Sequence, residues 1–148
     1  MSGSGIVVTR DFPVGVSQLW DELRQIDRHV LWMADAVALT FTTDQREGIG
    51  TTFHCRTKVG PFVTTDTMTV TSWTDEREMG VTHRGLITGE GLFSIVDLGA
   101  GKSRLEWREN LLFPWWALGG LGARVARPVL RLLWRGNLRR LERQICGN

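Results

Sequence analysis

The chain has 148 residues, a formal net charge of +2 and 42% hydrophobic residues, so it can bury a core without disulfides or metals. Its seven tryptophans and six phenylalanines, with no tyrosine, predict a core rich in aromatic side chains. The two cysteines, Cys55 and Cys146, are far apart and match no CxxC motif, which excludes a disulfide framework and indicates reduced thiols.

We expect a soluble, cytoplasmic protein. Residues 1–5 are polar and lack the charged and apolar regions of a signal peptide. The longest uncharged apolar run, residues 111–123, contains a proline and three glycines. A run this short and interrupted is not predicted to span a bilayer.

The first third of the chain predicts a strand followed by short helices. Residues 6–12 are rich in β-branched side chains and predict a strand. Ser17 is the expected N-cap of a helix whose apolar residues recur at helical spacing through residues 16–26. The polar residues 27–29 interrupt that pattern, and residues 30–33 then predict a short apolar turn or a second helix.

Six further strands are predicted in the middle of the chain. They cover residues 36–42, 51–59, 62–73, 79–84, 86–96 and 103–113. In the strand at 51–59, Phe53 and Cys55 alternate with polar side chains and are expected to face the core. The long, threonine-rich strand at 62–73 requires a twist or a bulge. Because every connection is short, the sheet is predicted to be antiparallel.

The last quarter of the chain, residues 114–145, has the periodicity of a long helix. One apolar line consists of Leu118, Leu121, Val125, Val129 and Leu132, and a second consists of Leu130, Trp134, Leu138, Leu141 and Ile145. Pro128 lies where the two lines overlap, and there it is expected to kink the helix or to begin a second one.

Charge is distributed unevenly between this helix and the rest of the chain. Residues 1–113 carry a net charge of −4, whereas residues 114–148 carry +6. Arg124, Arg127, Arg131 and Arg135 recur at helical spacing. Such a stripe fits either a solvated face or contact with an anionic membrane. The acidic strands and loops argue against nucleic acid as a partner.

No sequence motif identifies a catalytic or metal centre. The segment 101–103 resembles the end of a P-loop, but it lacks the first glycine and enters a strand. His29, His54 and His83 have no metal-ligand spacing, and Cys55 has no obvious neighbouring base. We therefore expect no metal, no cofactor and no covalent catalysis.

Three polar residues have the inward phase of their strands, namely Asp66, His83 and Glu109. Asp66 shares a face with Met68, and Glu109 shares one with Trp107. A carboxylate or imidazole among apolar neighbours is costly to bury and suits acid/base chemistry. The alternative for each residue is a hydrogen-bonded position at a strand end or at the rim of a cavity.

Several motifs resemble a known superfamily. The segment from Phe12-Pro13-Val14 to Leu19-Trp20, followed by Asp27 and Trp32, resembles the opening of START-like (SRPBCC) proteins. Three further segments resemble the polyketide cyclase/dehydrase branch of this superfamily. They are Gly48-x-Gly50-Thr51, Gly91-x-Phe93, and Arg104-Leu105-x-Trp107 with Phe113-Pro114. The resemblance covers nearly the whole chain, and its motifs are signatures of a fold.

The resemblance implies one domain over residues 1–148 with an α+β helix-grip fold. In this fold a curved antiparallel sheet of about seven strands wraps around a long C-terminal helix, with two short helices after the first strand. A hydrophobic cavity lies between sheet and helix. Members bind lipids, sterols, polyketides or plant hormones, and some catalyse ring cyclisation and dehydration. No universal catalytic residue of the superfamily transfers to this chain.

The leading interpretation is a protein that binds a small hydrophobic ligand. The expected cavity residues are Phe53, Cys55, Met68, Phe93 and Trp107 from the sheet, with Trp116, Leu121 and Val125 from the helix. Asp66, His83 or Glu109 would orient a hydroxyl or carbonyl group of the ligand.

Two alternatives remain open from the sequence. One is an enzyme of the polyketide cyclase, aromatase or dehydratase type, which would fold its substrate and use one of the same three polar residues as a general acid/base. The other is an interaction module in which Trp115, Trp116 and the arginine stripe rest on an anionic membrane.

Overall fold

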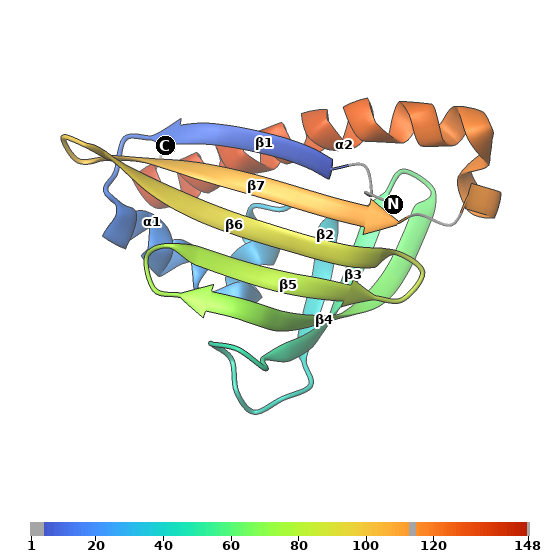
Figure 1. The fold of residues 1–148 in the computed structure, drawn as a ribbon, viewed down its shortest axis with the longest axis horizontal. Coiled ribbons are helices and arrows are strands. Elements are labelled where there is room, and N and C mark those ends of the chain that lie inside the picture. Colours follow the sequence, from blue (N-terminus) through green and yellow to red (C-terminus); the bar gives the residue numbers. More distant parts are fainter. Residues whose placement is uncertain (1–4, 113–114, 148) are drawn as a thin grey trace.

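Across the described part of the chain, seven strands form one curved antiparallel sheet (Figure 1). The computed structural model describes residues 5–112 and 115–147, except for the side chains of residues 115–125. The strands are β1 (Gly5–Phe12), β2 (Ala36–Phe41), β3 (Thr52–Val59), β4 (Phe62–Thr74), β5 (Glu78–Arg84), β6 (Thr88–Gly99) and β7 (Lys102–Leu112). Their order is β1-β7-β6-β5-β4-β3-β2, so β1 and β2 form the two edges.

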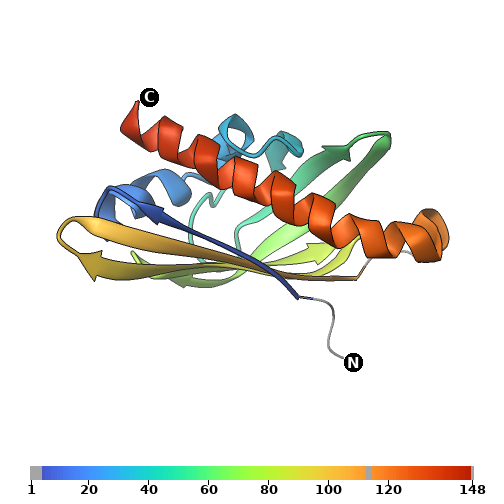
Figure 2. The ribbon, with the colours of Figure 1, turned by 90° about the horizontal axis from the view of Figure 1, so that it is seen from above.

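The helices in the described part of the chain lie on one face of the sheet (Figure 2). They are α1 (Val16–Leu23), the 3-10 helix η1 (Ile26–Leu31) and α2 (Trp115–Cys146). The first two carry the chain from the β1 edge to the β2 edge, and α2 packs along β1 and against α1. This arrangement is a helix-grip fold, and it confirms the predicted fold class, strand number and pair of helices after the first strand.

Side chains alternate across the sheet as predicted, and the expected bulge is present. Phe53 and Cys55 of β3 are buried, whereas His54 between them is exposed. In β4 the pairing with β5 shifts register between Val70 and Ser72. A bulge increases the local twist of a strand, so this shift helps the long strand to curve.

Two sequence predictions about element ends were wrong. Ser17 lies inside the first turn of α1, and Gly15 occupies the N-cap position with no side-chain hydrogen bond. Strand β6 begins at Thr88 and not at Leu86. The backbone N–H of Leu86 is bound by the buried carboxylate of Asp66, which draws the chain into a turn at this point.

The polar residues 27–29 do not interrupt the second helix, as the sequence had suggested, but form its middle. In a 3-10 helix side chains three residues apart lie on the same side. Ile26 and His29 are therefore buried together, followed by Trp32, while Asp27 faces solvent.

One continuous helix spans α2, and the prediction of a second helix beginning at Pro128 was wrong. The second apolar line faces the core, since Leu130, Trp134, Leu138 and Leu141 are buried and Ile145 packs against them. Of the first line, Val129 is 43% exposed and Leu132 is 67% exposed. The side chains of Leu118, Leu121 and Val125 lie outside the described residues. No helix in the described part of the chain is long and apolar enough to cross a membrane.

A buried polar network fixes α2 to the loop between η1 and β2. The side-chain oxygen of Asn137 accepts a hydrogen bond from the backbone of Ala34 at 2.9 Å, and its Nδ2 donates to Asp35 at 2.7 Å. Trp134 donates to the other oxygen of Asp35 at 3.2 Å. The ring of Trp134 stacks on Trp107 with centroids 5.0 Å apart. The network therefore positions an aromatic side chain of the helix against one of the sheet.

Candidate ligand cavity

A small cavity lies between the concave face of the sheet and η1. The described residues that line it are Ile26, His29, Met33, Ala36, Leu39, Phe53, Cys55, Met68, Met79, Val81, Gly91, Leu92, Phe93, Trp107 and Glu109. Its volume is about 60 Å³. Sites for drug-sized ligands typically occupy about 300–1,000 Å³, so a ligand of that size requires the walls to move.

The composition of the walls favours such movement. Met33, Met68 and Met79 all line the cavity. Methionine has an unbranched, flexible side chain that adapts to irregular spaces at low cost. The cavity is therefore closed by side chains that can change rotamer without unfolding the sheet.

The structure places most of the predicted sheet residues at this cavity. Phe53, Cys55, Met68, Phe93 and Trp107 all contribute to its wall, because each occupies an inward position of its strand. The predicted helix residues Trp116, Leu121 and Val125 lie outside the residues whose side chains are described.

Glu109 supplies the one carboxylate among the described lining residues. It is 6% exposed, and its Oε1 accepts a hydrogen bond of 2.8 Å from the indole N–H of Trp107. Its Oε2 has no hydrogen-bond partner among the described residues. A buried polar atom without a partner costs about 1–3 kcal/mol, so the fold retains this group at a cost.

His83 is a close polar neighbour of that oxygen. Its Nε2 lies 3.3 Å from Glu109 Oε2, which is within ion-pair distance but does not meet the geometry of a hydrogen bond. Both atoms are buried and remain without a hydrogen-bond partner in the described structure. The sheet therefore brings two of the three predicted polar residues together.

A glycine on β6 makes this meeting possible. Glu109 is on β7 and His83 is on β5, so the carboxylate must cross β6. Opposite Glu109 is Gly91, where a Cβ atom would lie 2.6 Å from both carboxylate oxygens. Opposite His83 is Gly89. The absence of a side chain at Gly91 leaves the space that Glu109 occupies.

Asp66 is the third predicted polar residue, and it has a different environment. It is 4% exposed and, like His83, is not among the described residues that line the cavity. One of its oxygens accepts hydrogen bonds from Thr64 Oγ1 at 3.2 Å and from the backbone N–H of Leu86 at 3.0 Å. These bonds secure the turn between β5 and β6, so Asp66 has the alternative role, that of a hydrogen-bonded residue outside the cavity.

His29 is a lining residue that sequence reasoning did not select. Its Nε2 donates to the carbonyl of Leu23 at 2.8 Å, and its ring packs edge-on against Phe93. Burial lowers the pKa of His29 to about 4, despite the opposing effect of that hydrogen bond. The ring is therefore neutral at physiological pH. The three-residue spacing of Ile26, His29 and Trp32 was the signal that could have identified it.

The remaining ionisable group on the wall is Cys55. Desolvation raises the pKa of its thiol to about 11. A nucleophilic cysteine requires a lowered pKa, so Cys55 acts here as a small apolar side chain. No lysine or arginine occurs among the described lining residues, and no three His, Cys, Asp or Glu side chains in the described chain are grouped so as to hold a metal ion.

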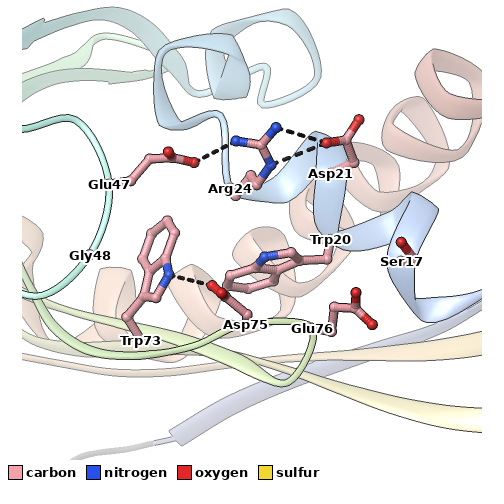
Figure 3. Close-up of a pocket in the computed structure, with 9 residues that line it drawn as sticks. All are labelled: Ser17, Trp20, Asp21, Arg24, Glu47, Gly48, Trp73, Asp75 and Glu76. Atoms are coloured by element: carbon pink, nitrogen blue, oxygen red, sulfur yellow. Dashed lines mark hydrogen bonds and ion pairs between the residues drawn. The ribbon is translucent and has the colours of Figure 1, made fainter.

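A second hollow is larger but open to solvent (Figure 3). It has a volume of about 550 Å³ and lies between α1, the loop before β3 and the β4–β5 turn. Apart from Glu76, which is exposed, its charged groups have partners, since Arg24 donates to Asp21 at 2.9 Å and to Glu47 at 2.7 Å. The indole of Trp73 donates to Asp75 at 2.9 Å. Because no buried group among the described residues lacks a partner here, we place the candidate site in the smaller cavity.

Comparisons with known proteins identify the fold. No protein-family model and no curated protein matches the sequence. Among solved structures, TTHA0849 of Thermus thermophilus has a TM-score of 0.84 at 13% identity, covering 97% of this chain and 98% of that one.

Two further solved structures are similar along nearly the whole chain. Zhui aromatase/cyclase from Streptomyces sp. R1128 has a TM-score of 0.71 at 14% identity, covering 97% of this chain and 92% of that one. Ara h 8.0201 has a TM-score of 0.71 at 10% identity, covering 98% and 99%. At these identities the comparisons show the fold alone, and they confirm the START-like helix-grip architecture that the sequence motifs resemble.

Proposed function

We propose that this START-like protein binds a small, mostly apolar molecule in the cavity between its sheet and η1. The observation that carries the proposal is a buried carboxylate, Glu109, with one oxygen unpartnered on the wall of an otherwise apolar cavity. A native fold rarely leaves a buried polar atom unsatisfied, and each such atom requires an explanation. A bound molecule with a polar group provides one.

The energetics favour an apolar body on that molecule. Removing apolar surface from water contributes roughly 25 cal/mol per Å². A ligand burying about 200 Å² thus gains on the order of 5 kcal/mol before the costs of association. Rearrangement of Met33, Met68 and Met79 is the route by which the cavity enlarges to receive it.

The test combines a blocked cavity with a matched control. Val81→Phe fills the cavity from β5, whereas Val63→Phe adds the same atoms at a position of β4 that is 42% exposed. We expect the neutral probe N-phenyl-1-naphthylamine to bind wild type and Val63→Phe, with its fluorescence increased, and to lose binding in Val81→Phe. Native mass spectrometry of protein purified from its own host would show any bound compound. Equal probe binding by the two variants contradicts the proposal.

The proximity of His83 to Glu109 favours a second candidate, an enzyme of the polyketide cyclase, aromatase or dehydratase type. A carboxylate on the cavity wall, with an imidazole 3.3 Å from it, can transfer protons to and from a bound substrate. The structural neighbour whose name is aromatase/cyclase supports this candidate by analogy of fold only. For this candidate, Glu109→Gln must abolish turnover of a poly-β-ketone substrate while its binding persists. Unchanged turnover in that variant excludes it.

We also propose peripheral contact between α2 and anionic membranes. Arg127, Arg131 and Arg135 are exposed beside the apolar side chains of Val129 and Leu132. Cationic and apolar groups on one helix surface bind anionic lipid together. Vesicles containing phosphatidylserine should sediment the protein, neutral vesicles should not, and the double variant Arg127→Glu/Arg131→Glu should remain unbound. Equal binding to both kinds of vesicle excludes this contact.

A cytoplasmic location completes the proposal. Cys55 and Cys146 are both free thiols in the structure. Unpaired thiols persist in reducing compartments. Fractionation of host cells should recover the protein with cytoplasmic markers or, where membrane contact occurs, with peripheral membrane proteins that are released by salt.

A further inference from the structure

The buried Glu109–His83 pair indicates the chemistry of the ligand's polar group. Glu109 Oε1 is occupied by the indole N–H of Trp107. Glu109 Oε2 and His83 Nε2 are buried, lie 3.3 Å apart and have no hydrogen-bond partner among the described residues. Glu109 lines the cavity and His83 is not among its described lining residues, so His83 is reached beside Glu109: a ligand atom within hydrogen-bond distance of Oε2 can also approach Nε2.

The polar group that fits both atoms must donate and accept hydrogen bonds. A carboxylate oxygen accepts only, so Glu109 Oε2 requires a donor. The ring nitrogen of His83 either donates or accepts, according to its tautomer. A hydroxyl group meets both requirements, since it carries one hydrogen and two lone pairs.

The charge around the cavity excludes an acid. The described lining residues contain one carboxylate and neither lysine nor arginine. His29 also lines the cavity, but its Nε2–H is already donated to the carbonyl of Leu23. A carboxylate or phosphate on the ligand would therefore lie beside Glu109 with no cation on the described wall to compensate its charge, and like charges at short distance in a dry site repel strongly.

The sequence reserves space for this arrangement. Gly91 lies opposite Glu109, and any Cβ at that position would lie 2.6 Å from both carboxylate oxygens. A longer side chain on β6 would turn Glu109 away from His83. The glycine thus keeps the carboxylate extended across β6, with its free oxygen beside the ring.

We infer that the ligand carries a hydroxyl group, as an alcohol, phenol or enol, on an apolar body, and that Glu109 and His83 bind this hydroxyl while excluding carboxylic acids of the same skeleton. The inference rests on the proposed function, because it assigns a polar group to the molecule that the cavity binds. Glu109 acts as the acceptor, and His83 completes the hydrogen bonding from the other side.

Three probes with one ring system test the inference, namely 2-naphthol, 2-methylnaphthalene and 2-naphthoate. Binding is followed by ¹H–¹⁵N NMR, with the indole N–H of Trp107 as reporter, because this group is bonded to Glu109 and lies on the cavity wall. We expect wild type to bind 2-naphthol at least about tenfold more tightly than 2-methylnaphthalene. We expect 2-naphthoate to bind more weakly than either.

Variants separate the role of the carboxylate from that of the apolar wall. Glu109→Gln should remove most of the preference for 2-naphthol, leave the affinity for 2-methylnaphthalene within about twofold of wild type and improve the binding of 2-naphthoate. Gly91→Ala should act in the same direction by displacing the carboxylate. The matched control is Glu90→Gln, which removes one charge at an exposed position of β6 and should change none of the three affinities.

The outcomes distinguish the inference from the function on which it rests. If wild type binds 2-methylnaphthalene as tightly as 2-naphthol, or prefers 2-naphthoate, the cavity binds ligands but the inference about the hydroxyl group is wrong. If none of the three probes perturbs the Trp107 signal and the neutral naphthylamine probe also fails to bind, the proposed function fails together with it.

Discussion

Asp66 on β4 and Glu109 on β7 are both inward-facing carboxylates, yet the fold treats them differently. Asp66 accepts two hydrogen bonds, one from a side chain and one from the backbone of a turn. Glu109 accepts one, from Trp107, and its second oxygen has no partner among the described residues. The two residues are equally buried, at 4% and 6% exposed.

The difference teaches that burial alone does not identify a functional carboxylate. The number of hydrogen-bond donors that the fold supplies is more informative, because a satisfied carboxylate contributes to stability while an unsatisfied one reduces it. We therefore expect Asp66 to have a structural role and Glu109 to be available to the proposed ligand. A mutation of Asp66 should mainly lower stability, whereas a mutation of Glu109 should mainly change ligand binding.

The largest effect on stability is expected from Asp66→Ala. The substitution leaves the Leu86 N–H and the Thr64 hydroxyl without their acceptor, and a bond to a charged group contributes about 1.5–3 kcal/mol. We expect the free energy of unfolding in urea to fall by about 3 kcal/mol. Ligand probes should still bind the folded fraction. A loss below about 1 kcal/mol would show that the turn does not depend on Asp66.

Lowering the pH should destabilise the cavity through His29. The folded-state pKa is about 4, below the ordinary histidine value of 6.5, so between these values the unfolded chain binds a proton that the folded protein does not. Stability is therefore complete above pH 6.5 and falls as the pH decreases towards 4. The difference between the two pKa values corresponds to about 3 kcal/mol in total, of which about 2 kcal/mol is lost by pH 5.

The measurement is urea unfolding at pH 7 and pH 5 for wild type and for His29→Gln. The variant loses the titrating ring and should lack most of this pH dependence, whatever its stability at pH 7. An equal decrease in both proteins would assign the effect to other groups. Because His29 lines the cavity, lowering the pH also adds a charge to the cavity wall without a mutation near Glu109.

A smaller effect is expected from Gly91→Ala. The new methyl group would contact the Glu109 carboxylate, and overpacking of this kind typically costs about 1–3 kcal/mol. The cost should be largely relieved in the double variant Gly91→Ala/Glu109→Ala, which a double-mutant cycle measures as a coupling energy. Gly136→Ala is the control, since no atom lies within 4 Å of its added Cβ and alanine favours a helix. Absence of coupling would show that position 91 does not set the carboxylate's place.

Sequence periodicity was sufficient for most of the architecture. Alternation predicted that Phe53 and Cys55 face inward, and short turns predicted the antiparallel order. The N-cap at Ser17 failed because Gly15 already had the extended backbone that precedes a helix. Of the two alternatives at Pro128, a second helix failed because packing of Leu130 and Trp134 on the core continues the helix beyond it. At Pro128, local propensity was overridden by tertiary contacts.

Periodicity also identified the inward-facing polar residues, but it could not show which of them lie close together. Asp66, His83 and Glu109 share the same inward phase, and only the pairing of β5, β6 and β7 shows that His83 and Glu109 meet across Gly91. His29 was missed because its 3-10 helix has a period of three and not the period of an α-helix. Cross-strand neighbours of this kind depend on register, which a single sequence does not specify.

The smallest effect on stability is expected from Glu109→Gln, and it completes the contrast with Asp66. The amide has nearly the same shape, and its oxygen can still accept the hydrogen bond from Trp107. The charge that is removed is a buried one whose second oxygen has no partner among the described residues, so its loss also removes a cost. We expect the free energy of unfolding to change by less than about 1 kcal/mol in either direction, measured in urea beside Asp66→Ala. If Glu109→Gln destabilises the fold as much as Asp66→Ala does, Glu109 is a structural residue and the distinction between the two carboxylates is lost. If Glu109 serves a ligand, the variant should be about as stable as wild type and should lose its selectivity for the hydroxylated probe.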